Sequence, residues 1–188
     1  MESENRIVAE DWSDDGRYIV YYTLSDMGEE IWLLPLFDDK TSIPVLRESF
    51  QPHEAKLSPD GKWIAYNSIE SGRCEVYIKP LEGDIERQIV STNGGGQPQW
   101  RSDGKELFYL ALDGSMMSVE IAEEPLRVGI PKKLFQTVLV VAPSIDQYAV
   151  TRDGQRFLIL NPGEAVNISS LNIVLNWFEE LKEKVPVD

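Results

Sequence analysis

Few side chains in this 188-residue chain are of a kind that could carry out catalysis. It has one histidine, His53, and one cysteine, Cys74, so it cannot assemble a multi-histidine metal site or a Ser-His-Asp triad with a histidine to spare. The G-x-S-x-G turn of hydrolases is absent, and so are the H-R-D and D-F-G motifs of kinases. We therefore expect no catalytic residue, no cofactor, no metal ion and no enzymatic activity in this chain.

Carboxylates beside glycines are the remaining candidates for a chemical site. Asp14 and Asp15 are adjacent, which could suggest a cation site, but no ladder of calcium ligands follows them. An Asp-Gly pair instead recurs in four copies of one repeated stretch, at steps of 45, 43 and 50 residues. Because Asp and Gly together favour a tight turn, we interpret all four pairs as structural turns. The pairs are Asp15-Gly16, Asp60-Gly61, Asp103-Gly104 and Asp153-Gly154.

Apolar residues recur at fixed distances from each pair, so the turn belongs to a larger repeated unit. Counted from the Asp, these positions are −3 (Trp12, Leu57, Trp100, Val150), +4 (Ile19, Ile64, Leu107, Phe157) and +6 (Tyr21, Tyr66, Tyr109, Ile159). Short runs rich in β-branched and aromatic residues follow the turns and predict β-strands. Each unit of about 45 residues contains a four-stranded antiparallel meander, which is the content of one β-propeller blade.

The sequence thus predicts an all-β fold, a β-propeller of about four blades. We expect one domain over residues 1–188, or a fragment of a longer propeller, with blades at about 5–47, 48–91, 92–138 and 139–177. The last blade is short of strands, and a short helix at 177–185 is expected to cover an exposed edge. Two arrangements stay open: a fragment whose unpaired edges invite self-association, and a closed four-bladed ring. We interpret the three glycines at 94–96 as a flexible link between blades rather than a phosphate loop.

The stretches "WSDDGRYIVY" at 12 and "LSPDGKWIAY" at 57 resemble the repeats of TolB-like β-propellers. Similar repeats precede prolyl-oligopeptidase-type hydrolase domains, and they form the C-terminal propellers of bacterial transmembrane Ser/Thr kinases. The ending "LNIVLNWFEELKEK" is most similar to the chain terminus of the kinase group. This resemblance implies a propeller with an extracytoplasmic location, either periplasmic or at the cell surface. Without it, a cytoplasmic location is the expectation.

The charge of the chain limits the kinds of partner. Eighteen basic residues against 32 acidic residues give a net charge of −14. Such a surface repels phosphate backbones and anionic lipids, so we expect neither a nucleic acid nor a membrane as partner. No apolar run is long enough to span a bilayer, and no basic-then-apolar leader opens the chain, so we expect no export or anchoring signal of its own.

Irregular loops are the best candidates for binding. In the resembled family, the loops from a fourth strand to the next first strand share a face with the loops between second and third strands, and this face usually carries the ligand. It would gather Phe50, Gln51, His53, Asn93, Gln97, Gln99, Ile145 and Gln147, with Asp26, Glu29, Glu70 and Arg73 as a charged outer ring. The competing interpretation is ordinary solvated loops.

From this mixture of amide, aromatic and charged groups we predict a protein or peptide partner. The chain would then be a sensory or scaffolding C-terminal region of a larger bacterial protein. The alternative is an accessory propeller that gates a hydrolase domain outside this chain. Alanine at Gln97 and Gln99 is expected to weaken binding of a partner and to leave stability nearly unchanged.

Overall fold

The computed structural model describes residues 6–25, 28–37, 40–47, 50–83, 86–123, 126–142, 145–160 and 172–174. The helix predicted at 177–185 lies outside the described residues, as does Asp26. Within the described part of the chain, no helix has the length and apolar character needed to cross a membrane.

The described strands form four antiparallel sheets, one for each repeat, which we call blades 1 to 4. Blade 1 consists of β1 (Arg6–Trp12), β2 (Tyr18–Ser25), β3 (Gly28–Pro35) and β4 (Ile43–Arg47). Blade 2 consists of β5 (His53–Leu57), β6 (Trp63–Ser68), β7 (Glu75–Pro80) and β8 (Gln88–Ile89). Blade 3 consists of β9 (Gly95–Trp100), β10 (Glu106–Ala111), β11 (Ser115–Glu123), β12 (Leu126–Val128) and β13 (Lys132–Gln136). Blade 4 consists of β14 (Tyr148–Val150), β15 (Phe157–Ile159) and β16 (Asn172–Val174).

This architecture confirms the predicted all-β propeller fold with four-stranded meanders. Blade 3 departs from the plain meander because two short strands, β12 and β13, share the place of its fourth strand beside β11. Gly129 lies between them, and its N–H donates to the carbonyl of Glu120 (2.8 Å). Pro131, which cannot donate to a strand ladder, follows just before β13. Blade 4 has three strands among the described residues.

The four Asp-Gly turns share one hydrogen-bonded geometry. Each glycine has a φ between 70° and 73°, a left-handed conformation that glycine adopts at little cost. Each Asp carboxylate accepts the backbone N–H two residues later, at 2.9, 3.1, 3.0 and 3.0 Å in chain order. Hydroxyl donors from Ser13 and Thr151 also lower the pKa of Asp15 and Asp153. The carboxylate of Asp15 is therefore used within its own turn.

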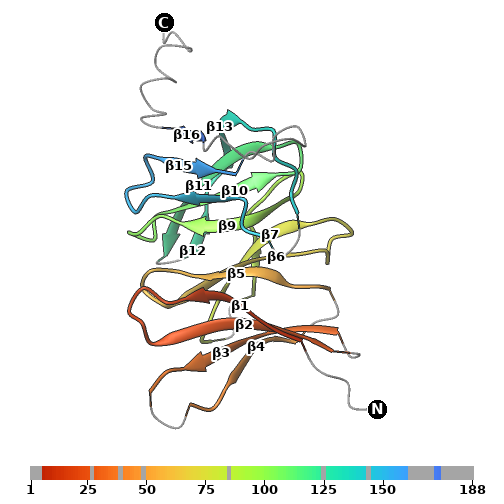
Figure 1. The fold of residues 1–188 in the computed structure, drawn as a ribbon, viewed down its shortest axis with the longest axis vertical. Helices are drawn as coiled ribbons and strands as arrows, with labels where there is room; N and C mark the ends of the chain where they lie inside the picture. The colour runs from red at the N-terminus through yellow and green to blue at the C-terminus, as the bar shows by residue number, and fades with distance from the viewer. Residues whose placement is uncertain are drawn as a thin grey trace, which may run out of the picture.

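The blades stack in chain order, with blade 1 at the bottom and blade 4 at the top of Figure 1. Blades 1 and 4 thus lie at opposite ends of the stack, and no strand of one pairs with the other in the described residues. Among the described residues, no strand pairing closes the four blades into a ring. The choice between a fragment of a longer propeller and a four-bladed ring stays a prediction.

Three apolar clusters lie between consecutive blades and hold the stack together. Positions −3, +4 and +6 of blades 2, 3 and 4 all point toward the preceding blade. Ile64, Leu107 and Phe157, at position +4, are each 0% exposed. The apolar positions found in the repeat are therefore the contacts between blades, and burying each such side chain contributes roughly 1.5–3 kcal/mol.

The three glycines at 94–96 belong to this packing, which corrects their interpretation as a flexible link. Gly95 and Gly96 begin β9, and all three are buried. A Cβ on Gly95 would lie 2.6 Å from the Tyr109 ring, and one on Gly96 would lie 2.9 Å from the Asn67 amide nitrogen. The backbone of β9 approaches its neighbours so closely that a side chain would not fit.

Candidate partner-binding site

The inner strands of consecutive blades are joined by side chains that reach the backbone of the next blade. Glu10 Oε2 accepts the N–H of Ala55 (2.6 Å), and Glu54 Oε2 accepts the N–H of Gln97 (2.7 Å). Gln97 Oε1 accepts the N–H of Gln147 (2.9 Å). These bonds join residues 45, 43 and 50 apart, the same steps as the Asp-Gly pairs. The inter-blade bond is thus part of the repeat.

Irregular backbone turns these side chains out of their own sheets. The pairing register shifts beside Glu10, beside Glu54 and opposite Gln97. Glu54 and Gln97 have φ values of 53° and 59°, which side-chain-bearing residues adopt at a cost. Such bulges commonly re-aim a side chain. Here they direct it along the stack, into the neighbouring blade.

Burial shifts the acid–base behaviour of the two glutamates in this row. Glu54 is 3% exposed, and burial raises its pKa to about 8 despite the bond from Gln97 N–H. Its Oε2 also accepts a bond from the Asn67 amide (2.6 Å). Burial likewise raises the pKa of Glu10 to about 7. Both side chains therefore hold a proton more readily than ordinary carboxylates.

A lysine joins three blades on the same side of the stack. Lys56 Nζ, on β5, donates to the carbonyl of Glu10 in blade 1 (2.7 Å) and to Asp146 Oδ2, two residues before blade 4 begins (2.8 Å). The Lys56 side chain is 12% exposed, so its charge is largely withdrawn from water and depends on these partners. Its position shows that the inner strands of blades 1, 2 and 4 converge here.

Four of the predicted contact residues remain at the surface. Phe50, Gln51, Asn93 and Ile145 are exposed, Phe50 by 43%. The backbone of Phe50 is fixed because its carbonyl accepts the Ser68 hydroxyl (2.9 Å). Their role in binding stays a prediction.

His53 lies in a partly buried, paired environment. Its Nε2 is 2.9 Å from Glu29 Oε2, and both side chains are 13% exposed. Its ring also packs edge-on against Tyr22, with 5.2 Å between ring centroids. Burial lowers the pKa of His53, and the nearby Glu29 opposes this only in part. The histidine links blades 1 and 2 rather than standing free in a loop.

The structure does not place Gln97 where the sequence predicts it. Its side chain is 0% exposed, and its Nε2 donates to Gln147 Oε1 (2.8 Å). The hydroxyl of Tyr148 donates to its carbonyl (2.6 Å). Gln97 therefore cannot be a surface contact that is neutral for stability, because it joins blades 3 and 4. Gln147 is half-buried in the same pair, and Ile145 is 56% exposed beside it.

Gln99 also lies elsewhere than predicted. It lines a hollow of about 180 Å³ together with Asp14, Pro59 and Arg152, which belong to the Asp-Gly turns of blades 1, 2 and 4. It therefore lies at the turn end of the inner strands, opposite the predicted loop face. This hollow is too small for a folded partner.

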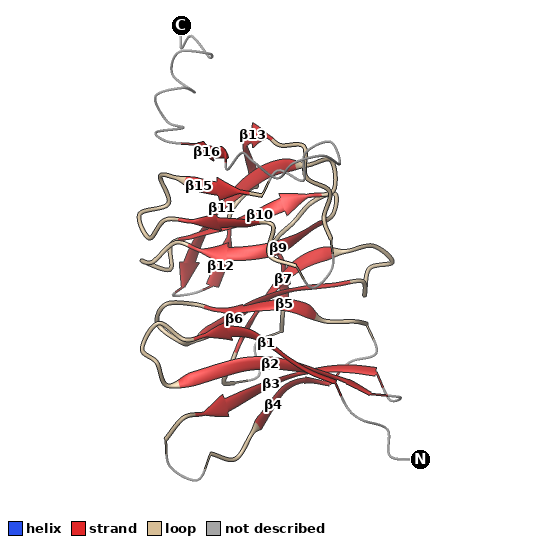
Figure 2. Cartoon of the chain, viewed as in Figure 1, coloured by secondary structure: helices blue, strands red, loops and turns tan. Residues whose placement is uncertain are grey.

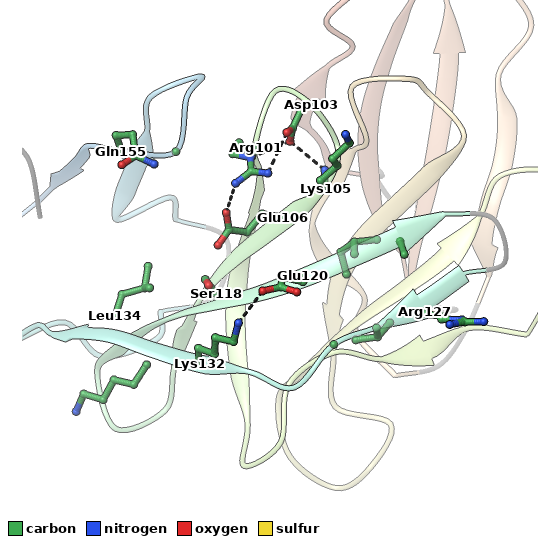
Figure 3. A pocket seen from close by; sticks show the side chains of 16 residues that line it. Arg101, Asp103, Lys105, Glu106, Ser118, Glu120, Arg127, Lys132, Leu134 and Gln155 are labelled. Carbon is green, nitrogen blue, oxygen red and sulfur yellow. Dashed lines mark hydrogen bonds and ion pairs between the residues drawn. The ribbon is translucent and has the colours of Figure 1, made fainter. Parts of the chain in front are cut away.

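A larger cleft, which the sequence does not predict, lies between blade 3 and the turn of blade 4. It has a volume of about 1200 Å³ and is lined by the Asp-Gly turns of blades 3 and 4 and by β10, β11, β12 and β13. Figure 3 shows charged side chains from the turn and from the strands directed into one open space. Buried Leu134 and Ile121 contribute apolar surface to its lining.

Positive charge prevails in this cleft. Its lining contains five basic residues, Arg101, Lys105, Arg127, Lys132 and Lys133, and three acidic ones, Asp103, Glu106 and Glu120. This local excess of two positive charges occurs in a chain whose net charge is −14.

Ion pairs fix part of the lining. Arg101 forms two bonds to Asp103 (2.8 and 2.9 Å) and one to Glu106 (2.5 Å), and Lys132 pairs with Glu120 (2.6 Å). The hydrogen bond from Arg101 lowers the pKa of Asp103, so this pair stays charged. Lys105 and Arg127 have no ion pair within 4.0 Å among the described residues, although Lys105 lies near the charge of Asp103. Lys133 also lacks an ion pair among these residues but donates to Gln136 Oε1 (2.5 Å), so Lys105 and Arg127 are the cations most open to a ligand.

The residues that line this cleft do not come from one continuous stretch of the sequence. Its cations come from a turn, from β12 and from β13, and acidic residues separate them along the chain. The sequence prediction treats the Asp-Gly turns only as connections, so it overlooks Lys105. Only the position of the turn next to β11 and β13 brings these charges together.

Comparison with known proteins supports the fold, but the matching segments of the curated relatives are short. No family model matches the chain. It is 41% identical over 54 residues to the Tol-Pal system protein TolB of Hydrogenovibrio crunogenus, covering 29% of this chain and 12% of that protein. It is 29% identical over 94 residues to tricorn protease homolog 1 of Streptomyces coelicolor, covering 47% of this chain and 8% of that protein. The chain spans 36% or less of the curated relatives it matches.

Among solved structures, TolB from Acinetobacter baumannii superposes with a TM-score of 0.68 at 18% identity. The match covers 94% of this chain and 45% of TolB. Together with the repeat and the stacked meanders, it defines the class: the chain has a β-propeller fold similar to that of TolB. Its four described blades correspond in extent to a little under half of that TolB chain.

Proposed function

We propose that this chain is a non-enzymatic module that binds a protein or peptide partner. The observation that carries the proposal is the cleft between blades 3 and 4, which combines ion-paired walls, buried apolar residues and two cations, Lys105 and Arg127, without an ion pair in the described part of the chain. Peptide segments suit such an open, charged groove on a rigid scaffold. The cleft replaces Gln97 and Gln99 as the centre of the binding hypothesis, while Phe50, Gln51, Asn93 and Ile145 stay as exposed candidates.

The chemistry of the cleft specifies the kind of segment. Carboxylates would meet Lys105 and Arg127 without leaving a charge unpaired, whereas a basic segment would compete with Arg101 and Lys132 for their own partners. We therefore propose an acidic segment of a protein as the ligand. The strongly negative remainder of the surface would repel such a segment, and this repulsion favours the cleft over other sites.

Titration of a fluorescently labelled oligoglutamate peptide tests this function. We expect saturable anisotropy changes that weaken with added salt, and binding at least about tenfold weaker for Lys105→Glu/Arg127→Glu. Lys62→Glu is the matched control, because Lys62 follows the Asp-Gly turn of blade 2 as Lys105 follows that of blade 3. Equal binding by oligolysine, or equal loss in the control, would refute the acidic-segment proposal.

The absence of enzymatic activity is part of this proposal. Cys74 is the single cysteine, and burial raises its pKa to about 11, so it is a poor nucleophile. The lone histidine is paired with Glu29. Hydrolysis of peptide, ester or lactone substrates by the purified chain at an enzyme-like rate would overturn it.

A second candidate is an accessory propeller for a hydrolase encoded elsewhere in a parent protein. The similarity to tricorn protease homolog 1 over 47% of the chain favours it, and so does the resemblance to propellers that precede prolyl-oligopeptidase-type domains. The complete reading frame discriminates between the two: a hydrolase domain supports the accessory role, and a kinase with a membrane span supports the sensory role. The sensory role implies an extracytoplasmic location, and so does the similarity to TolB.

A further inference from the structure

The stack of blades ends in two sheet faces that no described blade covers. The leading face is the side of blade 1 directed away from blade 2, with Ile7, Trp12, Ile19, Tyr21 and Trp32. The trailing face is the side of blade 4 directed away from blade 3, with Ala149, Leu158 and Leu160. The leading face also carries the Glu30–Arg47 ion pair, with the Arg47 guanidinium over the Trp32 ring. The two blades that bear these faces lie at opposite ends of the stack in Figure 1.

Repeat positions show that the leading face is half of an inter-blade interface. Position −3 is occupied by Leu57 in blade 2, where blade 1 leaves it 6% exposed. The equivalent residue of blade 1, Trp12, is 64% exposed. Ile19 and Tyr21 hold positions +4 and +6, which are at most 8% exposed in blades 2 to 4 but half-buried here.

The trailing face is the complementary half. Positions +5 and +7 point toward the following blade, and in blade 3 these are Phe108 and Leu110, both 0% exposed. In blade 4 the same positions are Leu158, 37% exposed, and Leu160, 51% exposed. Gln147 also occupies the place from which Glu54 and Gln97 reach the backbone of a following blade. The inner-strand bond could therefore continue past blade 4.

We propose that the chain associates head to tail with a second copy of itself, the trailing face of one copy packing on the leading face of the next. The interface would continue the three inter-blade contacts already present, using the same repeat positions on each side. A contact between two different faces either closes into a ring or grows into a filament. Two copies with four blades each would give eight, which lies within the range of known propellers.

Charged substitutions on each face test the contact. We expect sedimentation of the wild-type chain to show concentration-dependent association, and Ile7→Glu/Trp12→Glu or Leu158→Glu/Leu160→Glu to weaken it by at least about tenfold. The side chains are substantially exposed, so the variants should keep the wild-type circular dichroism spectrum. Ile69→Glu/Val138→Glu is the control, since these exposed residues lie on neither face and should leave association unchanged.

Mixing the two face variants gives the decisive measurement. Each has one intact face, so neither can associate with itself, but an equimolar mixture should form a one-to-one heterodimer that does not grow further. A wild-type chain that stays monomeric at every concentration would refute the proposal, as would a face variant that still self-associates. A mixture that remains monomeric would also refute it.

Discussion

Single residues in equivalent positions differ in what surrounds them, and the four Asp-Gly turns illustrate this. Gly61 and Gly154 have nearly the same φ, 70° and 72°. A Cβ on Gly61 would meet no atom within 4 Å, whereas one on Gly154 would lie 2.9 Å from Arg101 Cδ and 3.0 Å from Phe108 Cζ. The turn of blade 4 is thus packed against blade 3, while the turn of blade 2 projects into solvent.

Replacing each of these two glycines by alanine separates two losses of unfolding free energy. One comes from placing a side chain on a left-handed backbone, and the other comes from steric overlap with neighbouring atoms. We expect Gly61→Ala to lower the free energy of unfolding by about 1 kcal/mol, the cost of a left-handed conformation with a side chain. Gly154→Ala should cost roughly 2–4 kcal/mol because the added methyl group also collides with Phe108. Urea unfolding of both variants measures the difference. Equal losses would show that the blade 4 turn is not packed as described.

Glu54 makes stability depend on pH in the direction opposite to an ordinary carboxylate. Its folded-state pKa of about 8 is higher than the ordinary glutamate value of 4.5, so the folded protein holds a proton that the unfolded chain releases. Stability is then greatest below the unfolded pKa and falls as the pH rises from about 5 to 8. Glu10, with a pKa of about 7, adds to the same trend.

Glu54→Gln should remove most of this dependence, because a neutral amide oxygen can still accept the bonds from Gln97 and Asn67. At pH 8 we expect the variant to be more stable than the wild type by on the order of 1–4 kcal/mol, and at pH 5 to differ little. Thermal unfolding of both proteins from pH 5 to pH 8 measures this difference in stability. A wild-type protein whose stability rises steadily from pH 5 to 8 would contradict the assignment.

Among the secondary-structure elements, the inner strands do more than begin each blade. Their bulges carry the side chains that join blades, so β5 and β9 are connectors as well as strands. The sequence predicts the strands from their turns and apolar residues, but not these bulges. A positive φ at Glu54 and Gln97 opposes the usual preference of both residues, and the bonds of Glu54 with Gln97 and Asn67 and of Gln97 with Gln147 compensate for it.

Gln97→Ala tests the connecting role of β9. The variant loses the side-chain bonds to Gln147 and keeps its backbone bond to Glu54, so we expect a loss of about 1–3 kcal/mol. Gln51→Ala is the matched control, because Gln51 also has a positive φ (49°) but is exposed. Differential scanning calorimetry compares the two variants. Unfolding temperatures that shift equally would restore the prediction of a neutral surface glutamine.

At the scale of the whole molecule, the repeat explains why the fold was predictable and the candidate site was not. Four Asp-Gly turns with apolar residues at −3, +4 and +6 encode both the hairpins and the contacts between blades. The cleft depends on how the turn of blade 4 lies over β11 and β13, a relation between units that the pattern within a unit does not contain. Gln97 was misplaced for a related reason, since its burial comes from blade 4.

The row of bonds from Glu10 to Ala55, from Glu54 to Gln97 and from Gln97 to Gln147 gives the array a polarity. Each unit contributes an acceptor to its successor and a backbone donor to its predecessor. A unit copied by gene duplication would bring both halves of this connection with it and would fit at any interior place. Growth or shrinkage of the array by whole units then needs no new joining residue, and a deletion that is not a whole unit breaks two connections at once.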